Sequence, residues 1–364
     1  MTDARVERRQ ALRWDVFCRV IDNHGDLGVC WRLASQLVQR GERCRLWVDD
    51  ASALAWMAPA PRSVAVHAFD DAARAEPGDV VIEAFGCDPP AGFVERMRAA
   101  APPPVWINLE YLSAQDYVER SHGLPSPQTT GPGAGLTKWF SFPGFTPGSG
   151  GLLRAPQAAS AAMLPLRDNE RAVLIFAYAH ARLGLLLDAL DVEPTLVLAA
   201  QGPSQPLLEA MFRGDGRGRH LRLHRLPWLD QSSFDALLPA CALNVVRGED
   251  SLVQALWAGA PFVWNIYAQD DGAHEAKFDA FLDRMLDRTA VAAAGDVRRM
   301  FRALNGLAAG GEPLPPLDTP RLAAWRAAIA PWVESLRAQE DLVTRLVAYV
   351  ARRRREGSIA GARR

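Results

Sequence analysis

The sequence predicts an α/β protein built from two doubly wound halves. Short apolar runs of strand length alternate with segments whose apolar residues recur at helical spacing, from residue 14 to about 286. Residues 121–170, rich in Pro, Gly, Ser and Thr, interrupt the alternation and divide it into two series. A chain of 364 residues is long for one core and ordinary for two.

The first series begins with the apolar run WDVFCRVI, residues 14–21, which suits a buried parallel strand. After the turn DNHGDLG, the apolar residues from Leu27 to Val38 recur at helical spacing, and Gly41 ends that helix. The run CRLWV, residues 44–48, completes a β-α-β unit. Further strands are predicted at 63–69, 79–85 and 104–112.

The second series repeats the pattern after the interruption. Strands are predicted at 171–178, 194–202, 221–228, 242–248 and 261–267, with helices at 181–190, 231–241, 251–259 and 272–286. A single long amphipathic stretch, 319–355, follows them. We therefore expect one Rossmann-like domain at 1–155, a second at 156–330, and a C-terminal helix at 331–364 that packs back on the first domain.

Two Rossmann-like domains facing each other across a cleft form the GT-B arrangement of nucleotide-sugar glycosyltransferases. Some dinucleotide enzymes share this plan, so the fold alone does not decide the function.

Composition excludes several classes of protein. A net charge of −1 argues against a nucleic-acid partner, which usually requires a basic surface. Five cysteines without a C-x-x-C pair argue against structural zinc or a disulfide framework. The seven histidines show no metal-ligand spacing. Because no apolar run has the length of a signal peptide or a membrane span, we expect a cytoplasmic protein without a membrane partner.

The turn at residues 22–28, DNHGDLG, is the first candidate for chemistry. It follows the first predicted strand, where open α/β sheets place their ligands. Asp22 is expected to end the strand and Asp26 to begin the helix; two such carboxylates can hold a cation or accept a proton. A purely structural alternative is that Asp26 caps the helix. The turn lacks the G-x-G-x-x-G pattern, so a nicotinamide site would be atypical.

The second candidate is the segment Arg247-Gly248-Glu249-Asp250-Ser251, between an apolar strand and a helix. Free amide groups at a helix start bind phosphate, and an arginine adds a bidentate, permanently charged partner. The alternatives are a helix cap for Asp250 and a surface ion pair between Arg247 and Glu249. The position at a strand end favours a diphosphate site.

Aromatic residues form a third candidate. Tyr178 and Trp228 each stand at or just after a predicted strand end, where a ring can stack on a nucleobase. Gln231 lies close enough in sequence to read the edge of that base. Core packing is the common alternative for a single aromatic residue.

A glycine-rich loop, FPGFTPGSGGLLR at residues 142–154, is the last feature that stands out. Its composition fits either a ligand cradle or a hinge between the domains, and does not separate the two.

Taken together, these segments resemble the elongation factor P arginine rhamnosyltransferases. The resemblance runs from residue 14 to about 285 and rests on long, idiosyncratic stretches in the expected order: DNHGDLGVCWRLA, IEAFGC, INLEYLSAQDYVERSHGLPS, FPGFTPGSGGLLR, RGEDSLVQALWAGAPFVW and IYAQDDGAHEAKFDAFL. One departure is Asn265, where histidine is expected in relatives; it puts only a peripheral contact in doubt.

The resemblance implies a GT-B fold and an inverting transfer that needs no metal or cofactor. The donor would be dTDP-β-L-rhamnose, bound by the second domain, and the acceptor an arginine of elongation factor P, bound by the first. The implied catalytic pair is Asp22 and Asp26. The implied donor-binding residues are Tyr178, Trp228 (often Phe in relatives), Arg247, Asp250 and Ser251, with Glu249 in the same loop and Gln231 beside the base.

Two other interpretations stay open. The chain could be another GT-B nucleotide-sugar enzyme, such as an epimerase or a transferase with a small-molecule acceptor. It could also be a non-catalytic protein that binds only elongation factor P or a nucleotide. Presence of both the aspartate pair and the RGEDS segment counts against a pure binder, because protein binding alone requires no diphosphate site.

Overall fold

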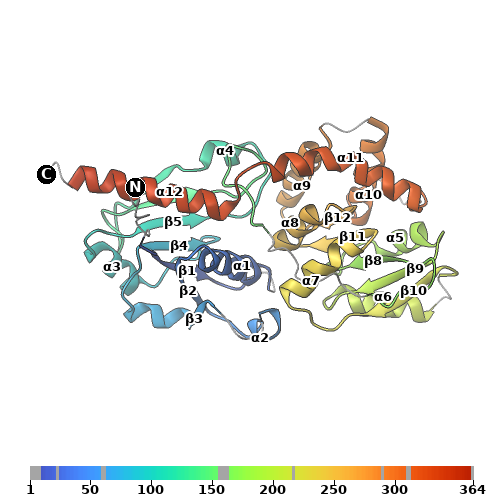
Figure 1. Ribbon diagram of the computed structural model, residues 1–364, viewed down its shortest axis with the longest axis horizontal. Coiled ribbons are helices and arrows are strands. Elements are labelled where there is room, and N and C mark those ends of the chain that lie inside the picture. The colour runs from blue at the N-terminus through green and yellow to red at the C-terminus, as the bar shows by residue number, and fades with distance from the viewer. Residues whose placement is uncertain are drawn as a thin grey trace, which may run out of the picture.

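The chain forms two β-sheets that lie side by side, each with its own helices (Figure 1). This computed structural model describes residues 10–21, 24–58, 63–154, 164–214, 218–287, 291–308 and 313–361. We call the described residues from 10 to 154 the first half and those from 164 to 337 the second half. The predicted α/β class with two doubly wound sheets is confirmed.

The first sheet has the strand order β3-β2-β1-β4-β5-β7-β6. All neighbouring strands are parallel except β6 and β7, which form an antiparallel edge. The sheet reverses its direction of growth at β1, which pairs with β2 on one side and β4 on the other. The strands are β1 Arg13–Cys18, β2 Arg43–Val48, β3 Ala65–Ala68, β4 Val80–Ala84, β5 Val105–Leu109, β6 Pro125–Pro127 and β7 Thr137–Ser141.

The second sheet repeats this topology with five parallel strands in the order β10-β9-β8-β11-β12. Its reversal point is β8, which pairs with β9 and β11. The strands are β8 Arg171–Ile175, β9 Thr195–Ala199, β10 Leu221–Arg225, β11 Leu243–Arg247 and β12 Phe262–Asn265. Both sheets thus open at a central strand, the point where doubly wound folds bind ligands.

The helices of the first half cover both faces of its sheet. Helix α1 packs on one face, and η1 and α3 pack on the other around Phe17 and Trp106. Helix α1 is amphipathic, and its apolar positions are buried as the sequence pattern predicts. These elements are α1 Gly25–Gln39, α2 Leu54–Met57, η1 Phe69–Arg74, α3 Ala91–Ala99 and α4 Tyr117–Ser121.

The second half has a larger core, to which helices on both faces contribute. Helices α9, α10 and α11 surround an aromatic cluster that includes Phe281, Phe301 and Trp325. The elements are α5 Leu183–Leu190, α6 Ser204–Gly214, α7 Gln231–Leu237, η2 Leu238–Ala240, α8 Glu249–Ala258, α9 Ala273–Leu286, α10 Val291–Leu304 and α11 Thr319–Arg337.

The predicted single stretch at 319–355 is wrong: it forms two helices, α11 and α12, the latter at Leu342–Gly361. The side chain of Asp341 starts α12, because its carboxylate accepts hydrogen bonds from the backbone N–H and the hydroxyl of Thr344. Helix α11 packs on the second half, whereas Leu342, Leu346 and Val350 of α12 belong to the core of the first. The end of the chain therefore crosses back over the first sheet (Figure 1).

Residues 121–170, whose composition indicates a loop region or an interdomain hinge, also contain the strands β6 and β7, which add an edge to the first sheet. The glycine-rich loop at 142–154 lies at the joint between the halves. Phe145 contacts Phe281 and Trp332 of the second half at ring-centroid distances of 5.5 and 5.6 Å, while Leu153 packs in the first core. The proposed domain boundaries near 155 and 330 stay predictions.

A buried charge cluster supports the start of the first sheet. Asp15 on β1 is fully buried and accepts hydrogen bonds from Arg45, from the indole of Trp47 and from the backbone N–H of Gly78. The distance from Arg45 Nε to Asp15 Oδ1 is 2.6 Å. The carboxylate is therefore fully paired despite its burial.

We expect Asp15→Ala to lower the free energy of unfolding by about 3–5 kcal/mol, because it leaves a guanidinium and two N–H groups without their acceptor. Urea unfolding monitored by circular dichroism measures this. The control is Asp283→Ala, which removes the exposed partner of Arg298 and should change stability by less than about 1 kcal/mol. Equal effects of the two substitutions would contradict the assignment.

Candidate active site

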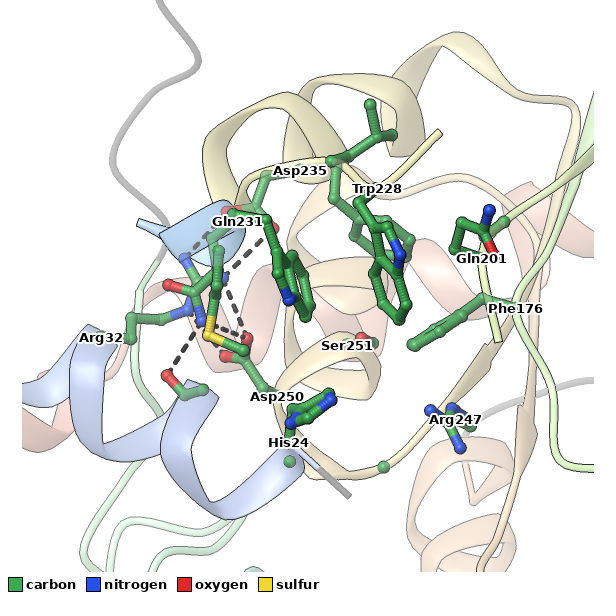
Figure 2. Close-up of a pocket in the computed structure, with 18 of the residues that line it drawn as sticks. His24, Arg32, Phe176, Gln201, Trp228, Gln231, Asp235, Arg247, Asp250 and Ser251 are labelled. Atoms are coloured by element: carbon green, nitrogen blue, oxygen red, sulfur yellow. Dashed lines mark hydrogen bonds and ion pairs between the residues drawn. The ribbon is translucent and has the colours of Figure 1, made fainter. Parts of the chain in front are cut away.

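A pocket lies between the two halves, at the carboxyl ends of the central strands. The turn after β1 and helices α1 and α2 form one wall, and the segments after β8, β10 and β11 form the other (Figure 2). Its empty volume is about 870 Å³, counted together with the open solvent at its mouth. Both sheets present their reversal points to it, which is why these loops meet here.

The turn after β1 differs from the sequence prediction. Strand β1 ends at Cys18, not at Ile21, and Asp22 lies outside the described residues. Helix α1 begins at Gly25 without a side-chain cap, so the alternative that Asp26 caps it is wrong. Asp26 is 4% exposed, and its carboxylate accepts a hydrogen bond of 3.0 Å from the backbone N–H of Ile21. Asp26 thus closes the turn, whose residues His24, Gly25 and Gly28 line the pocket.

Arg247 ends β11 and lies in the pocket wall (Figure 2). Its guanidinium sits over two rings, 4.7 Å from the centroid of Phe176 and 4.8 Å from that of Tyr178. Such stacking fixes the plane of the guanidinium without neutralising its charge. Sequence reasoning missed Phe176, although it stands two residues before Tyr178 and strand periodicity places both on one face.

Helix α8 begins directly after Arg247. Gly248 occupies the cap position with φ of 69°, a conformation that favours glycine, and no side chain caps the helix. The structural alternative that Asp250 caps α8 is therefore wrong. Gly248 and Ser251 line the pocket, so the start of the helix, with its positive end of the dipole, faces the cavity.

Tyr178 is held in place by Asn265. The backbone N–H of Tyr178 donates to Asn265 Oδ1 at 2.7 Å, and Asn265 Nδ2 donates to Asn305 Oδ1 at 2.9 Å. Asn265 is fully buried. The position that departs from the expected histidine is therefore central to the placement of Tyr178, and not peripheral as the sequence suggested.

Glu249 does not pair with Arg247, as one alternative proposed. Its carboxylate binds Lys277 Nζ at 2.6 Å and accepts a hydrogen bond from the backbone N–H of Leu112 at 2.8 Å. Leu112 belongs to the first half and Lys277 to α9 of the second. Glu249 therefore connects the RGEDS segment to both sides of the pocket.

Asp250 and Gln231, both predicted to bind the donor, lie against helix α1 (Figure 2). Arg32 Nε donates to Asp250 Oδ1 at 2.7 Å and Arg32 Nη2 to Asp250 Oδ2 at 3.0 Å. Gln231 Nε2 donates to the carbonyl oxygen of Gly28 at 2.9 Å. These contacts join the two halves at the base of the pocket.

The sequence analysis missed Arg32 and its second partner, Asp235. Both are buried, and burial raises the pKa of Asp235 to about 6 although the Arg32 guanidinium opposes this shift. The sequence does hold a signal: Arg32 stands between Cys30, Leu33 and Ala34 on a helix whose other positions there are apolar. A charge at such a position indicates a buried partner, but not which one.

Trp228 is half-exposed at the mouth of the pocket. Its ring lies 4.4 Å from Trp56 of α2 and 6.4 Å from His24, centroid to centroid, so it bridges to the first half. Phe234, which the sequence analysis also missed, contacts Phe176 at 5.3 Å deeper in the pocket. The pocket therefore has an aromatic lining, and the stacking of a nucleobase on Trp228 stays a prediction.

The described residues contain neither a metal-binding group nor a helix suited to span a membrane. Within the ranges given above, no three His, Cys, Asp or Glu side chains gather as a metal-binding group. The helices in the same part of the chain include none that is both long and apolar enough to cross a membrane.

The architecture is that of the GT-B class of glycosyltransferases. Among solved structures, the calicheamicin glycosyltransferase CalG4 matches 94% of this chain with a TM-score of 0.53 at 14% identity, which shows the fold alone. A structure described as the basis for EarP-mediated arginine glycosylation of translation elongation factor EF-P matches 94% of this chain and 99% of its own, with a TM-score of 0.59 and 27% identity.

The family is shown by sequence. The family model described as Elongation-Factor P (EF-P) rhamnosyltransferase EarP matches residues 14–351. Protein-arginine rhamnosyltransferases of Pseudomonas putida and Pseudomonas aeruginosa are 40% and 38% identical to the chain, covering 92% and 93% of it and 98% of each relative. The chain belongs to the EarP family and is a protein-arginine rhamnosyltransferase.

We expect Arg247→Ala to weaken binding of dTDP by about 1.5–3 kcal/mol, the range for hydrogen bonds to charged groups. Its guanidinium, held over Phe176 and Tyr178, is placed to pair with a diphosphate. Isothermal titration calorimetry measures the dissociation constant. Arg225→Ala is the matched control, because Arg225 ends β10 of the same sheet and pairs with Glu209. An unchanged constant for Arg247→Ala would place the diphosphate elsewhere.

Proposed function

We propose that this enzyme transfers L-rhamnose from dTDP-β-L-rhamnose to an arginine side chain of translation elongation factor P, with inversion and without a metal ion. The observation that carries the donor side is the meeting of Arg247 and the uncapped start of α8 in one pocket. The family description, which names elongation factor P, supports the acceptor.

The second half would bind the donor. The amide groups at the start of α8 and the guanidinium of Arg247 attract the diphosphate and stabilise the charge that grows on it as the glycosidic bond breaks. A divalent metal would supply the same stabilisation, and these groups replace it. The aromatic lining offers ring faces for the thymine base.

The first half would bind the acceptor arginine. A guanidinium has a pKa above about 12, so it reaches the site as a cation and is a poor nucleophile. A carboxylate can orient one nitrogen and accept its proton while the new bond forms. We assign this role to Asp22, which lies outside the described residues, and assign to Asp26 the support of the turn that carries it.

The step balances as one displacement. A guanidinium nitrogen attacks the anomeric carbon from the face opposite the diphosphate, and the C–N bond forms as the C–O bond to the diphosphate breaks. The proton of the attacking nitrogen passes to the carboxylate, and dTDP leaves with its bonding pair. Inversion follows because the attacking nitrogen and the leaving oxygen occupy opposite faces.

Intact-mass spectrometry of elongation factor P, incubated with this enzyme and dTDP-rhamnose, tests the proposal. We expect the mass to rise by one deoxyhexose residue, and tandem spectrometry to place the sugar on an arginine. Free arginine should be a very poor acceptor, since it offers little docking area to orient the reacting nitrogen.

Addition of EDTA to the same assay tests whether the transfer requires a metal ion. We expect the initial rate to stay unchanged on chelation, because Arg247 and α8 stabilise the leaving group. A loss of activity that magnesium or manganese restores would refute the metal-free part of the proposal, and an unmodified elongation factor P would refute the whole.

We expect Asp22→Asn to abolish transfer while dTDP binding stays within about twofold of wild type. The amide keeps the shape of the carboxylate but cannot accept the proton, and a lost general base lowers rates by roughly 10²–10⁴-fold. Initial rates and calorimetry measure the two effects. Asp49→Asn, which changes an exposed carboxylate near the same sheet edge, is the control. Turnover of the Asp22 variant near the wild-type rate would remove this residue from the base role.

A further inference from the structure

A charge cluster with little solvent exposure joins the two halves in the wall of the pocket. Arg32 of α1 faces Asp235 of α7 and Asp250 of α8, and we call these three residues the Arg32 cluster. The exposed fractions of their side chains are 4%, 8% and 15%. Arg32 Nη1 donates to Asp235 Oδ2 at 2.8 Å and Arg32 Nη2 to Asp235 Oδ1 at 3.2 Å. One guanidinium therefore serves two carboxylates from two different helices.

Both carboxylate oxygens of Asp250 have hydrogen-bond partners. Arg32 binds both of its oxygens, Gln231 Nε2 lies 3.3 Å from Oδ2, and Gln254 Nε2 lies 3.4 Å from Oδ1. Asp250 lines the pocket, but in this arrangement its carboxylate is already bound by side chains of α1, α7 and α8. Its neighbour Ser251 and the helix start remain on the cavity side.

Helix α1 lies close to Gln231 and Asp250 at the position of Gly28. Gly28 of α1 accepts a hydrogen bond from Gln231, and a Cβ added at Gly28 would lie 3.3 Å from Gln231 Nε2 and 3.9 Å from Asp250 Oδ2. An alanine at this position would therefore require the amide of Gln231 to shift by a few tenths of an ångström. The same turn of α1 begins with His24 and Gly25, which line the pocket.

We propose that Arg32 is a positioning residue for rhamnosyl transfer, which holds the RGEDS segment against the start of α1 and so keeps the donor and acceptor sides of the pocket in register. The proposal rests on the proposed function insofar as α8 holds the diphosphate. A displacement of the reacting groups by about 1 Å can lower an enzyme's rate by about 10²-fold, so control of this joint bears directly on turnover.

The Arg32 cluster is not part of the apolar core of either half. The apolar cores of the two sheets are built from other residues, and each sheet has a core of its own. Loss of the guanidinium removes the attachment of α1 to both helices and leaves the carboxylates of Asp235 and Asp250, both in the second half, without their cation. Hydration of these carboxylates then favours separation of α1 from α7 and α8. We therefore expect the halves to stay folded and their relative placement to change.

The test compares Arg32→Gln with Arg40→Gln. Arg40 lies on the same helix and pairs with Asp341 at 2.7 Å, but this pair joins α1 to α12 and not to the second half. For Arg32→Gln we expect kcat to fall at least tenfold at saturating dTDP-rhamnose, and the distance between spin labels on the two halves to lengthen and broaden. For Arg40→Gln we expect both to stay near wild type. Arg32→Lys should recover kcat only in part. The ammonium keeps the positive charge, but it reaches fewer of the four carboxylate oxygens than the guanidinium does.

The double variant Arg32→Gln/Asp235→Asn distinguishes positioning from stability. It removes one of the two facing charges, so we expect the melting temperature to return toward wild type while kcat stays low. Recovery of kcat in parallel with the melting temperature would reduce Arg32 to a structural role and overturn the proposal. A wild-type label distance in Arg32→Gln would also overturn it. The label distances need no turnover, so they test Arg32 even if elongation factor P is not the acceptor.

Discussion

Parallel strands end at one edge of a sheet, and this constraint organises the whole molecule. Each sheet reverses at a central strand, β1 in the first half and β8 in the second, and the loops at the reversal diverge to leave an opening. Both openings face the same pocket. The turn after β1, the aromatic residues after β8 and the segment after β11 meet there because the two sheets present corresponding edges to one another.

Polar contacts join the halves close to the pocket, and both polar and apolar contacts join them farther from it. Arg32 with Asp250, and Glu249 with the backbone of Leu112, bind the RGEDS segment from the first half. Away from the pocket, Phe145 of the glycine-rich loop packs between Phe281 and Trp332. Directional contacts therefore set the geometry where the chemistry takes place, while the glycine-rich loop and the return of α12 hold the halves together.

The RGEDS segment therefore has two roles, one toward the ligand and one at the joint between the halves. All five residues of the segment line the pocket. Arg247, Gly248 and Ser251 present charge and helix amides to it, while the carboxylates of Glu249 and Asp250 bind Lys277 and Arg32. Consecutive residues at the start of a helix point in different directions, about 100° apart on a turn of 3.6 residues, so one short motif can serve the ligand and the joint at once. Its two acidic residues hold the segment in place, while its arginine and serine face the cavity.

The sequence by itself determined the class of fold, the strand series and the two turns that line the pocket, because apolar periodicity and strand ends are local properties of the chain. The same local patterns indicated Arg247 and Tyr178 as candidates, the family resemblance assigned their roles, and both line the pocket. Tertiary structure decided the partners. Arg32 and Asp250 are 218 residues apart in the sequence. Glu249 pairs with Lys277 and not with the nearby Arg247, and the ring of Trp228 lies against that of Trp56. Asn265, which looked peripheral, proved to hold Tyr178. Such pairings depend on how two separately folded sheets are placed against each other, and no local pattern of residues encodes that placement.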